Sequence, residues 1–305
     1  MIKADNLTKT FDDYKALNGI SCTIEEGCIY GMVGSNGAGK STFLRLLTGI
    51  YRADMGTITI DGNDVYENTE LKSHMAFVPD ELYFLGGASM DRMAKLYSAA
   101  YPDFSGERYE HLKEIFKLSG SRSLNTFSKG MKRQAATILA LSCRPRYLFL
   151  DETFDGLDPV MRNLVKNIVC QDVVDRKATA ILTSHSLREL EDTCDQLALL
   201  HKGGLVLESD ISNIKTSLFK VQVAFTGEFA GTYGRDTFSD LDILHYTKHG
   251  SVANIIVRGD KADVTAKIQA KHPVILDILP LTLEEVFTYE MEALGYSFDD
   301  VLVNN

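Results

Sequence analysis

The stretch Gly34-Ser35-Asn36-Gly37-Ala38-Gly39-Lys40-Ser41 decides the fold, because it matches the pattern G-x-x-x-x-G-K-[ST] at every fixed position. It follows the apolar run Cys28–Val33, which predicts a strand, and it precedes Thr42–Leu47, which predicts a helix. A strand, a glycine-rich loop and a helix form the context that this pattern requires. The glycines let backbone N–H groups turn inward around phosphate oxygens, and the helix adds the positive end of its dipole. The stretch therefore predicts a phosphate-binding loop.

Two side chains of this loop have distinct predicted roles. Lys40 is expected to reach the β- and γ-phosphates of a nucleoside triphosphate, and Ser41 is expected to hold Mg²⁺. A chance match in a glycine-rich turn is the alternative, and the flanking strand and helix argue against it. The candidate nucleotide-binding residues here are Gly34, Ser35, Asn36, Gly37, Ala38, Gly39, Lys40, Ser41 and Thr42.

A second apolar run, Tyr147–Leu150, ends in the two carboxylates Asp151 and Glu152. At the end of a strand beside the phosphate-binding loop, Asp151 is expected to reach the magnesium shell. Glu152 then lies near the γ-phosphate, where it can orient or deprotonate the attacking water. The alternative is an ordinary exposed strand end.

Composition limits the class of protein. The 305 residues are 45% hydrophobic and 24% charged, which is typical of a globular chain, and 32 basic against 42 acidic residues leave a net charge of −10. An acidic chain gains no general attraction to a phosphate backbone, so no nucleic-acid partner is expected. Five cysteines without a CxxC pair predict neither a zinc site nor disulfides. No apolar stretch reaches about 20 residues, so a membrane span, if one is needed, is expected in another subunit.

The order of apolar runs predicts an α/β fold. Strand-like runs alternate with helical ones in the first part of the chain, which indicates a mostly parallel sheet covered on both faces. A helical subdomain is expected over about 85–134. We expect one domain over 1–212 and a small α/β accessory domain over 213–305. The strand-like runs are Ile2–Leu7, Cys22–Ile24, Cys28–Val33, Gly56–Asp61, Met75–Pro79, Tyr147–Leu150, Ala178–Leu182, Gln196–Leu200, Phe219–Phe225, Val252–Arg258 and Val274–Leu279.

Five motifs in one order resemble the ATP-binding subunit of an ABC transporter over about residues 1–212. They are the phosphate-binding loop, Ser128-Lys129-Gly130-Met131, the run LFLDE that ends at Glu152, Gly156-Leu157-Asp158 and Thr183-Ser184-His185. The resemblance implies a P-loop ABC ATPase core with a mixed sheet, a helical subdomain and a C-terminal appendage. It also implies ATP and Mg²⁺ as ligands and a dimer in which two subunits sandwich two nucleotides.

The resemblance carries roles onto further residues. Phe11 occupies the position where the family stacks an aromatic ring on adenine, with a core phenylalanine as the alternative. Ser128 and Gly130 lie in the loop that contacts the ATP of the opposite subunit. Asp158 matches the aspartate that links the two sites, and His185 matches the histidine that contacts the γ-phosphate. The catalytic set is then Glu152, His185 and Lys40.

Two departures from the family pattern bear on the site. Asp80 stands where the family usually has glutamine; it could ligate Mg²⁺, directly or through water, or be a tolerated exchange. Lys129 replaces a glycine of the signature loop. Ser128 is a predicted N-cap, so Lys129, Lys132 and Arg133 would lie in the first turn of a helix, where cations are unfavourable. We therefore expect Lys129 to contact the γ-phosphate of the partner's ATP, with a solvated lysine as the alternative.

The signature Ser128-Lys129-Gly130-Met131 and the tail LTLEEVFTYEMEALGY resemble the exporter branch with separate ATPase and membrane chains. This implies a cytoplasmic ATPase that attaches to the inner face of the membrane through a permease subunit. A peptide or a drug-like amphiphile is the expected cargo, and the surface near Tyr83, Phe84 and Leu85 is the expected docking groove. The alternatives are a soluble ABC-type ATPase that acts on ribosomes or DNA, and a regulatory ATP-binding module.

Overall fold

The computed structural model describes residues 1–211, 218–226, 232–293 and 295. They form two compact units, which divide between Glu208 and Ser209. The predicted boundary at 212/213 lies outside the described residues, as do Gly227, Gly231 and the end of the tail motif. That boundary therefore stays a prediction.

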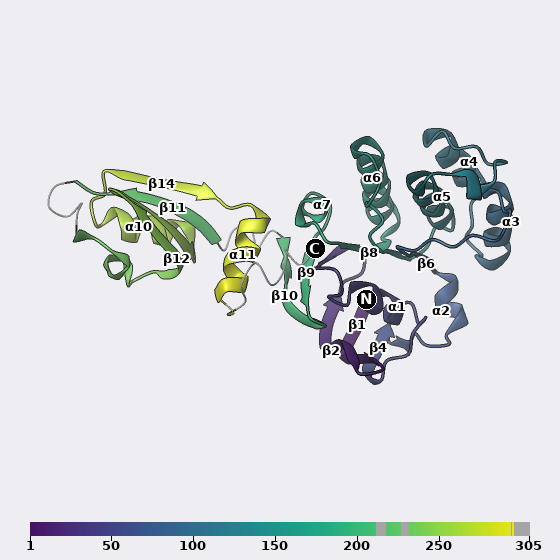
Figure 1. Cartoon of the computed structure of the whole chain (residues 1–305), viewed down its shortest axis with the longest axis horizontal. Coiled ribbons are helices and arrows are strands. Elements are labelled where there is room, and N and C mark those ends of the chain that lie inside the picture. The colour runs from purple at the N-terminus through teal and green to yellow at the C-terminus, as the bar shows by residue number, and fades with distance from the viewer. Residues whose placement is uncertain (212–217, 227–231, 294, 296–305) are drawn as a thin grey trace. The chain divides into compact units, whose positions relative to one another are not determined.

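A six-stranded sheet forms the centre of the first unit (Figure 1). Its order is β10-β9-β3-β8-β7-β6, and the pairs β9–β3, β3–β8, β8–β7 and β7–β6 are parallel. Parallel strands end at a common edge, so the loops after β3, β6, β7 and β8 meet there. The bounds are β3 (Ile29–Val33), β6 (Met75–Val78), β7 (Tyr147–Leu150), β8 (Thr179–Ser184), β9 (Gln196–His201) and β10 (Gly204–Asp210), with helices α6 (Pro159–Arg176) and α7 (Leu187–Glu191) between β7 and β9.

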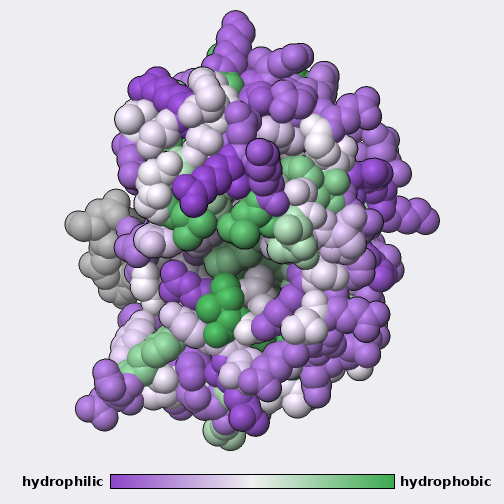
Figure 2. All heavy atoms as spheres, turned by 90° about the vertical axis from the view of Figure 1, so that its right-hand side faces the viewer, coloured by the Kyte–Doolittle hydropathy of each residue, from purple (hydrophilic) through white to green (hydrophobic). Residues whose placement is uncertain are grey.

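The predicted helical subdomain follows β6. It contains α3 (Met90–Ala100), α4 (Gly106–Ile115), the 3₁₀ helix η1 (Leu124–Thr126) and α5 (Lys129–Ser142), which gather at one end of the unit (Figure 1). On that side apolar side chains surround a hollow in the surface (Figure 2). Among the described residues, no helix combines the length and the apolar character needed to cross a bilayer.

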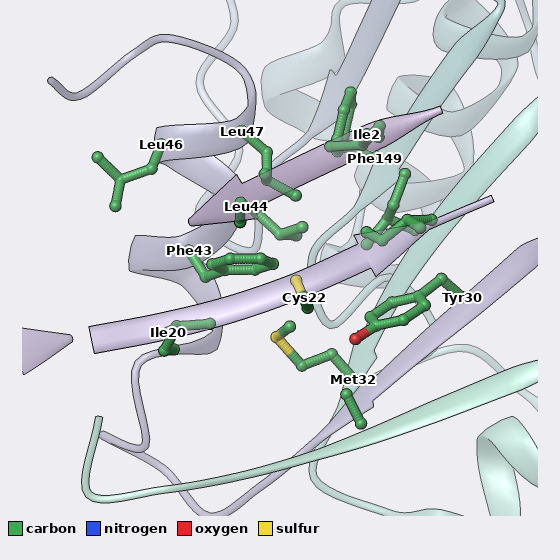
Figure 3. Packing of buried hydrophobic residues seen from close by; sticks show 14 of the residues in the cluster. Ile2, Ile20, Cys22, Tyr30, Met32, Phe43, Leu44, Leu46, Leu47 and Phe149 are labelled. Carbon is green, nitrogen blue, oxygen red and sulfur yellow. The ribbon is translucent and has the colours of Figure 1, made fainter. Parts of the chain in front are cut away.

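An antiparallel sheet of order β2-β1-β4-β5 packs against α1 (Lys40–Leu47) in the first unit. The helix turns Phe43, Leu44 and Leu47 toward the strands (Figure 3). This buried cluster holds the first turn of α1, and thus Lys40 and Ser41, at a fixed place beside the end of β3. The bounds here are β1 (Ile2–Phe11), β2 (Tyr14–Ile24), β4 (Met55–Ile60), β5 (Asn63–Asp64) and the short helix α2 (Thr69–Ser73).

The second unit is a small α/β fold with an antiparallel sheet of order β12-β13-β11-β14. Its core contains Phe219, Val221, Ile255 and Ile268. Sequence analysis missed β10 and β12, because neither strand alternates buried and exposed residues along its length. The bounds are β11 (Leu218–Ala224), η2 (Arg235–Phe238), β12 (Asp242–His249), β13 (Val252–Arg258), α10 (Lys261–Gln269), β14 (Ile275–Pro280) and α11 (Leu283–Ala293).

The packing of α1 predicts a difference between two identical substitutions. Leu44 is fully buried and Leu96 of α3 is 50% exposed. We expect Leu44→Ala to lower the free energy of unfolding of the first unit by about 2–5 kcal/mol, because it leaves a cavity in the core. Leu96→Ala should change that free energy by less than about 0.5 kcal/mol. Urea unfolding of both variants measures the difference, and equal losses would contradict this assignment of the core.

Candidate active site

The glycines of the phosphate-binding loop adopt backbone conformations that few other residues reach. Gly37 and Gly39 have φ angles of 79° and 108°. A Cβ atom at Gly39 would lie 2.7 Å from the Ala16 carbonyl oxygen, and one at Gly34 would lie 2.4 Å from that of Leu200. Both steric limits and backbone angles therefore require glycine in this loop.

Lys40 is the central cation of the site. Its side chain is only 5% exposed, and its ammonium group donates to the carbonyl oxygens of Gly34 (2.7 Å) and Ser35 (3.2 Å). The same Nζ atom lies 3.0 Å from Oε1 of Glu152. An ion pair thus links the loop after β3 to the end of β7.

Asp151 is fully buried, and its two carboxylate oxygens differ. Oδ1 accepts a hydrogen bond of 2.7 Å from the hydroxyl of Thr183 at the end of β8. Oδ2 has no hydrogen-bond partner among the residues that the structure describes. A buried carboxylate oxygen without a donor is unfavourable, so Oδ2 suits a cation or a water bound to one.

Glu152 is held from four directions. Its φ angle of 46° lies in the left-handed region, which non-glycine residues rarely adopt. Its N–H donates to the Thr183 hydroxyl at 3.0 Å. Its carboxylate bridges Lys40 on one oxygen and Nδ1 of His185, at 3.0 Å, on the other. Its backbone carbonyl accepts a hydrogen bond from Arg133.

Arg133, in the second turn of α5, is 1% exposed. Its Nη2 atom donates to both Oδ1 (2.7 Å) and the backbone oxygen (3.0 Å) of Asp80. The Asp80 carboxylate, predicted as a metal ligand, therefore has a guanidinium partner in this structure, and its predicted role at Mg²⁺ stays untested. Asp80 itself follows β6, so Arg133 joins the helical subdomain to two strand ends.

A cavity of about 240 Å³ lies over the loop and joins several predicted residues. Phe11 borders it, 38% exposed, with its ring edge-on to Tyr51. Two larger hollows, of about 560 and 590 Å³, lie elsewhere and contain no residue of the loop. The lining of the smaller cavity is Phe11, Tyr14, Ala16, Asn36, Gly37, Ala38, Gly39, Lys40, Ser41, Thr42, Asp80 and Glu152.

The signature residues do not line this cavity. Ser128 caps α5 by accepting from the Met131 N–H at 3.2 Å, as predicted, and Asp158 caps α6. Lys129 lies 3.4 Å from the Asp155 carboxylate, with both side chains largely exposed. Since Lys129 and Arg133 both have anionic partners within the chain, the argument from uncompensated charge no longer supports a phosphate contact for Lys129. The contact itself stays a prediction.

Sequence analysis missed three residues of the site. Tyr14 donates its hydroxyl to the Gly37 carbonyl at 3.0 Å, and Thr183 links Asp151 to Glu152. Thr183 had a usable signal, because it opens the motif that contains His185. Arg133 had a partial signal, because a cation near the start of a helix is unfavourable without an anion, but its partner Asp80 lies 53 residues away in the chain.

Comparisons with known proteins identify the family. A family model described as "ABC transporter" matches residues 17–155. The chain is 28% identical to the ABC transporter ATP-binding protein YtrB of Bacillus subtilis, over 94% of this chain and 97% of that protein. It is 31% identical to the uncharacterized ABC transporter ATP-binding protein YhaQ of B. subtilis, with coverage of 73% and 76%. It is also 31% identical to the daunorubicin/doxorubicin resistance ATP-binding protein DrrA of Streptomyces peucetius, with coverage of 71% and 67%.

Solved structures share the fold. A structure described as the ATP-binding subunit of an ABC transporter has a TM-score of 0.65 and 24% identity, and the match covers 70% of this chain and 92% of that one. A nucleotide-free ATP-binding cassette has a TM-score of 0.58 and 21% identity, with coverage of 69% and 91%. The first unit therefore has the cassette fold.

Thr183 and Thr153 offer a matched test of the site. Both are 1% exposed, but the Thr153 hydroxyl has no hydrogen-bond partner in the described part of the chain. Thr183→Val removes the donor to Asp151 and the acceptor for the Glu152 N–H. We expect its rate of ATP hydrolysis to fall about 10- to 100-fold, the loss expected for such buried groups. Thr153→Val should keep the native rate, and equal effects of the two substitutions would contradict the arrangement. Steady-state kinetics with melting curves measure both.

Proposed function

Since the chain belongs to the ABC transporter family of ATP-binding proteins and is an ATPase of that family, we propose that it powers a separate membrane subunit and that Glu152 is its catalytic base. The observation that carries the proposal is the Glu152 carboxylate, held between Lys40 and His185 beside the phosphate-binding loop. Such a group is placed to accept a proton from a water that attacks the γ-phosphate. Lys40, the loop N–H groups and His185 would bind and orient the phosphates, and Phe11 would stack on the adenine.

The ion pair of Lys40 with Glu152 suggests how binding prepares the base. The three donors of the Lys40 ammonium group already serve Gly34, Ser35 and Glu152, and we infer that a contact to phosphate oxygens replaces the one to Glu152. When the ammonium group turns to the phosphates, Oε1 of Glu152 loses its donor and becomes free to accept a water proton. Nucleotide binding would then activate the base in the same step, because the Lys40 ammonium exchanges Glu152 for the phosphates.

Mg²⁺ fits the residues present. The described residues contain no cluster of three or more His, Cys, Asp or Glu side chains that could hold a metal ion. Mg²⁺ prefers one or two protein oxygens together with phosphates and water, and Ser41 with the unpaired Oδ2 of Asp151 meets that requirement. The bound ion would neutralise charge on the phosphates. The role at Mg²⁺ predicted for Asp80 stays a sequence-based expectation, because its carboxylate pairs with Arg133 in this structure.

We further propose that two copies close on ATP. Ser128, Lys129, Gly130 and Asp158 lie away from the cavity of their own chain, which suits residues that act on the nucleotide of a partner. A glycine is needed at 130, because a Cβ atom there would lie 2.9 Å from the carbonyl oxygen of Gly156. The backbone of the signature loop therefore lies close to the segment that precedes Asp158.

We propose the transport role from the similarity to resistance proteins and from exposed apolar side chains. DrrA is a resistance protein for daunorubicin and doxorubicin, and LnrL of B. subtilis, 30% identical, is one for linearmycin. These names favour export of a drug-like amphiphile, and a peptide cargo stays a prediction. Tyr83, Leu85 and Leu96 are 85%, 45% and 50% exposed, and we propose that exposed apolar side chains in the region beyond β6 dock a permease. The loop that begins at Asp80 would connect that region to the site.

Replacement of Glu152 tests the catalytic assignment. Glu152→Gln keeps size but removes the base, so hydrolysis should fall about 100- to 10,000-fold. ATP affinity should equal or exceed that of the native protein, because Lys40 no longer has to leave an ion pair. Turnover and nucleotide titration measure the two effects. The control is Glu107→Gln on the exposed face of α4, which should behave as native. Near-native turnover of Glu152→Gln would overturn the assignment.

Lys129 tests the closed dimer. With ATP, the Glu152→Gln protein should dimerise, and Lys129→Ala should weaken that dimer about tenfold and reduce its salt dependence, if a charge-assisted contact to phosphate is lost. Lys95→Ala, an exposed charge on α3, is the matched control. Sedimentation at low and high salt measures the dimer constants. If the dimer constants of Lys129→Ala equal those without the substitution, Lys129 does not contact the phosphate and interacts with Asp155 alone.

A further inference from the structure

Arg133 is a fully buried cation that the reaction described above does not use. A buried guanidinium is unfavourable unless a counter-ion and hydrogen-bond acceptors surround it. Among the described residues, Arg133 forms an ion pair with Asp80, in which Nη2 lies 2.7 Å from Oδ1. Since Asp80 is 45% exposed and Arg133 only 1%, the arginine depends more on this pair than the aspartate does.

The second partner of Arg133 is the backbone of the proposed base. One terminal nitrogen serves Asp80, and the other donates to the carbonyl oxygen of Glu152. The planar fork of arginine can hold both at once, which a lysine cannot do with one ammonium group. Arg133 therefore fixes the distance between the end of β6 and the residue that follows Asp151.

Glu152 needs such a restraint. A non-glycine residue with φ of 46° persists where its surroundings determine that conformation. Thr183 fixes the N–H and Arg133 fixes the carbonyl oxygen, so both backbone groups of Glu152 are held. The direction of its side chain toward Lys40 and His185 follows from that backbone conformation.

We propose that Arg133 is a positioning residue for ATP hydrolysis, with Asp80 as its counter-ion. The guanidinium, neutralised by Asp80, keeps the Glu152 backbone in the left-handed turn that aims its carboxylate at the site. Asp80 then acts on the reaction through Arg133 and not through the metal. This inference rests on the proposed role of Glu152 as the base.

The position of Asp80 in the chain gives this pair a further consequence. Asp80 begins the segment that contains the exposed Tyr83 and Leu85. A displacement of this segment that separates Asp80 from Arg133 leaves a buried cation unpaired and removes support from the Glu152 carbonyl. The pair thereby makes the rate of hydrolysis sensitive to the placement of this segment.

A double-mutant cycle tests the inference on the full chain. The variants are Arg133→Met, which removes the charge and keeps an apolar side chain of similar length, Asp80→Asn, and the two together. Arg133→Met should lower kcat about 10- to 100-fold, the range for one hydrogen bond from a charged group, and should leave ATP affinity within about threefold. Asp80→Asn should also lower kcat. The double variant should be no slower than Arg133→Met, because Asp80 acts through the arginine.

A buried ion pair remote from the loop controls for loss of stability. Arg108 of α4 lies 2.6 Å from Asp172 of α6, and Asp172 is 6% exposed. Arg108→Met and Asp172→Asn should lower the melting temperature while the folded protein keeps its native kcat. Should Arg133→Met fail to fold, Arg133→Lys takes its place; it keeps the charge and should lower kcat with ATP affinity retained.

Three outcomes would overturn the inference. One is native kcat in Arg133→Met or its lysine substitute. Another is multiplication of the two losses in the double variant, since Asp80 would then act independently. The third is a raised Mg²⁺ requirement in Asp80→Asn that persists in the double variant, which would make Asp80 a metal ligand. Near-native turnover of Glu152→Gln would instead refute the proposed base, so the two failures are distinguishable.

Discussion

The ion pair between Lys40 and Glu152 is the interaction on which the site depends. It joins the phosphate-binding loop after β3 to the acidic end of β7, at the edge where parallel strands end together. Both side chains are largely buried, so their attraction is weakly screened by solvent and salt. Loss of either partner leaves the other as an unpaired, largely buried charge, which is unfavourable. A phosphate group that competes for the ammonium would therefore leave the Glu152 carboxylate without its cation.

The backbone around that pair is as constrained as the charges. Glycines with positive φ shape the loop, and Glu152 adopts a left-handed conformation without being glycine. Thr183 and Arg133 satisfy its N–H and its carbonyl oxygen from β8 and from α5. The carboxylate is therefore oriented by elements that also include the helical subdomain, and one guanidinium links that subdomain to the proposed base.

The sequence predicted the α/β core, the helical subdomain and the loop, because each depends on local pattern. The apolar strand before Gly34, the one before Asp151 and the N-cap at Ser128 can each be recognised from a few consecutive residues. The pairing of Arg133 with Asp80 is a long-range contact of two charged residues that look solvated in the sequence. The three basic residues near the start of α5 therefore seemed uncompensated, whereas the structure pairs Arg133 with Asp80 and Lys129 with Asp155. Strand β12 was not predicted for another reason: its residues are almost all half-buried and show no alternation of buried and exposed positions.

The charges of the site bear on the form in which a nucleotide enters it. Asp80, Asp151 and Glu152 supply three carboxylates against the two cations Lys40 and Arg133, and Arg133 is already committed to Asp80. The ammonium group of Lys40 thus remains to offset the charges of both Asp151 and Glu152 before any phosphate arrives. A triphosphate without a metal would add several negative charges beside the buried Asp151, which lacks a donor on one oxygen. A divalent cation that arrives with the phosphates would satisfy that oxygen and offset the charge, so the acidic balance of the site supports the proposed binding of ATP as its magnesium complex.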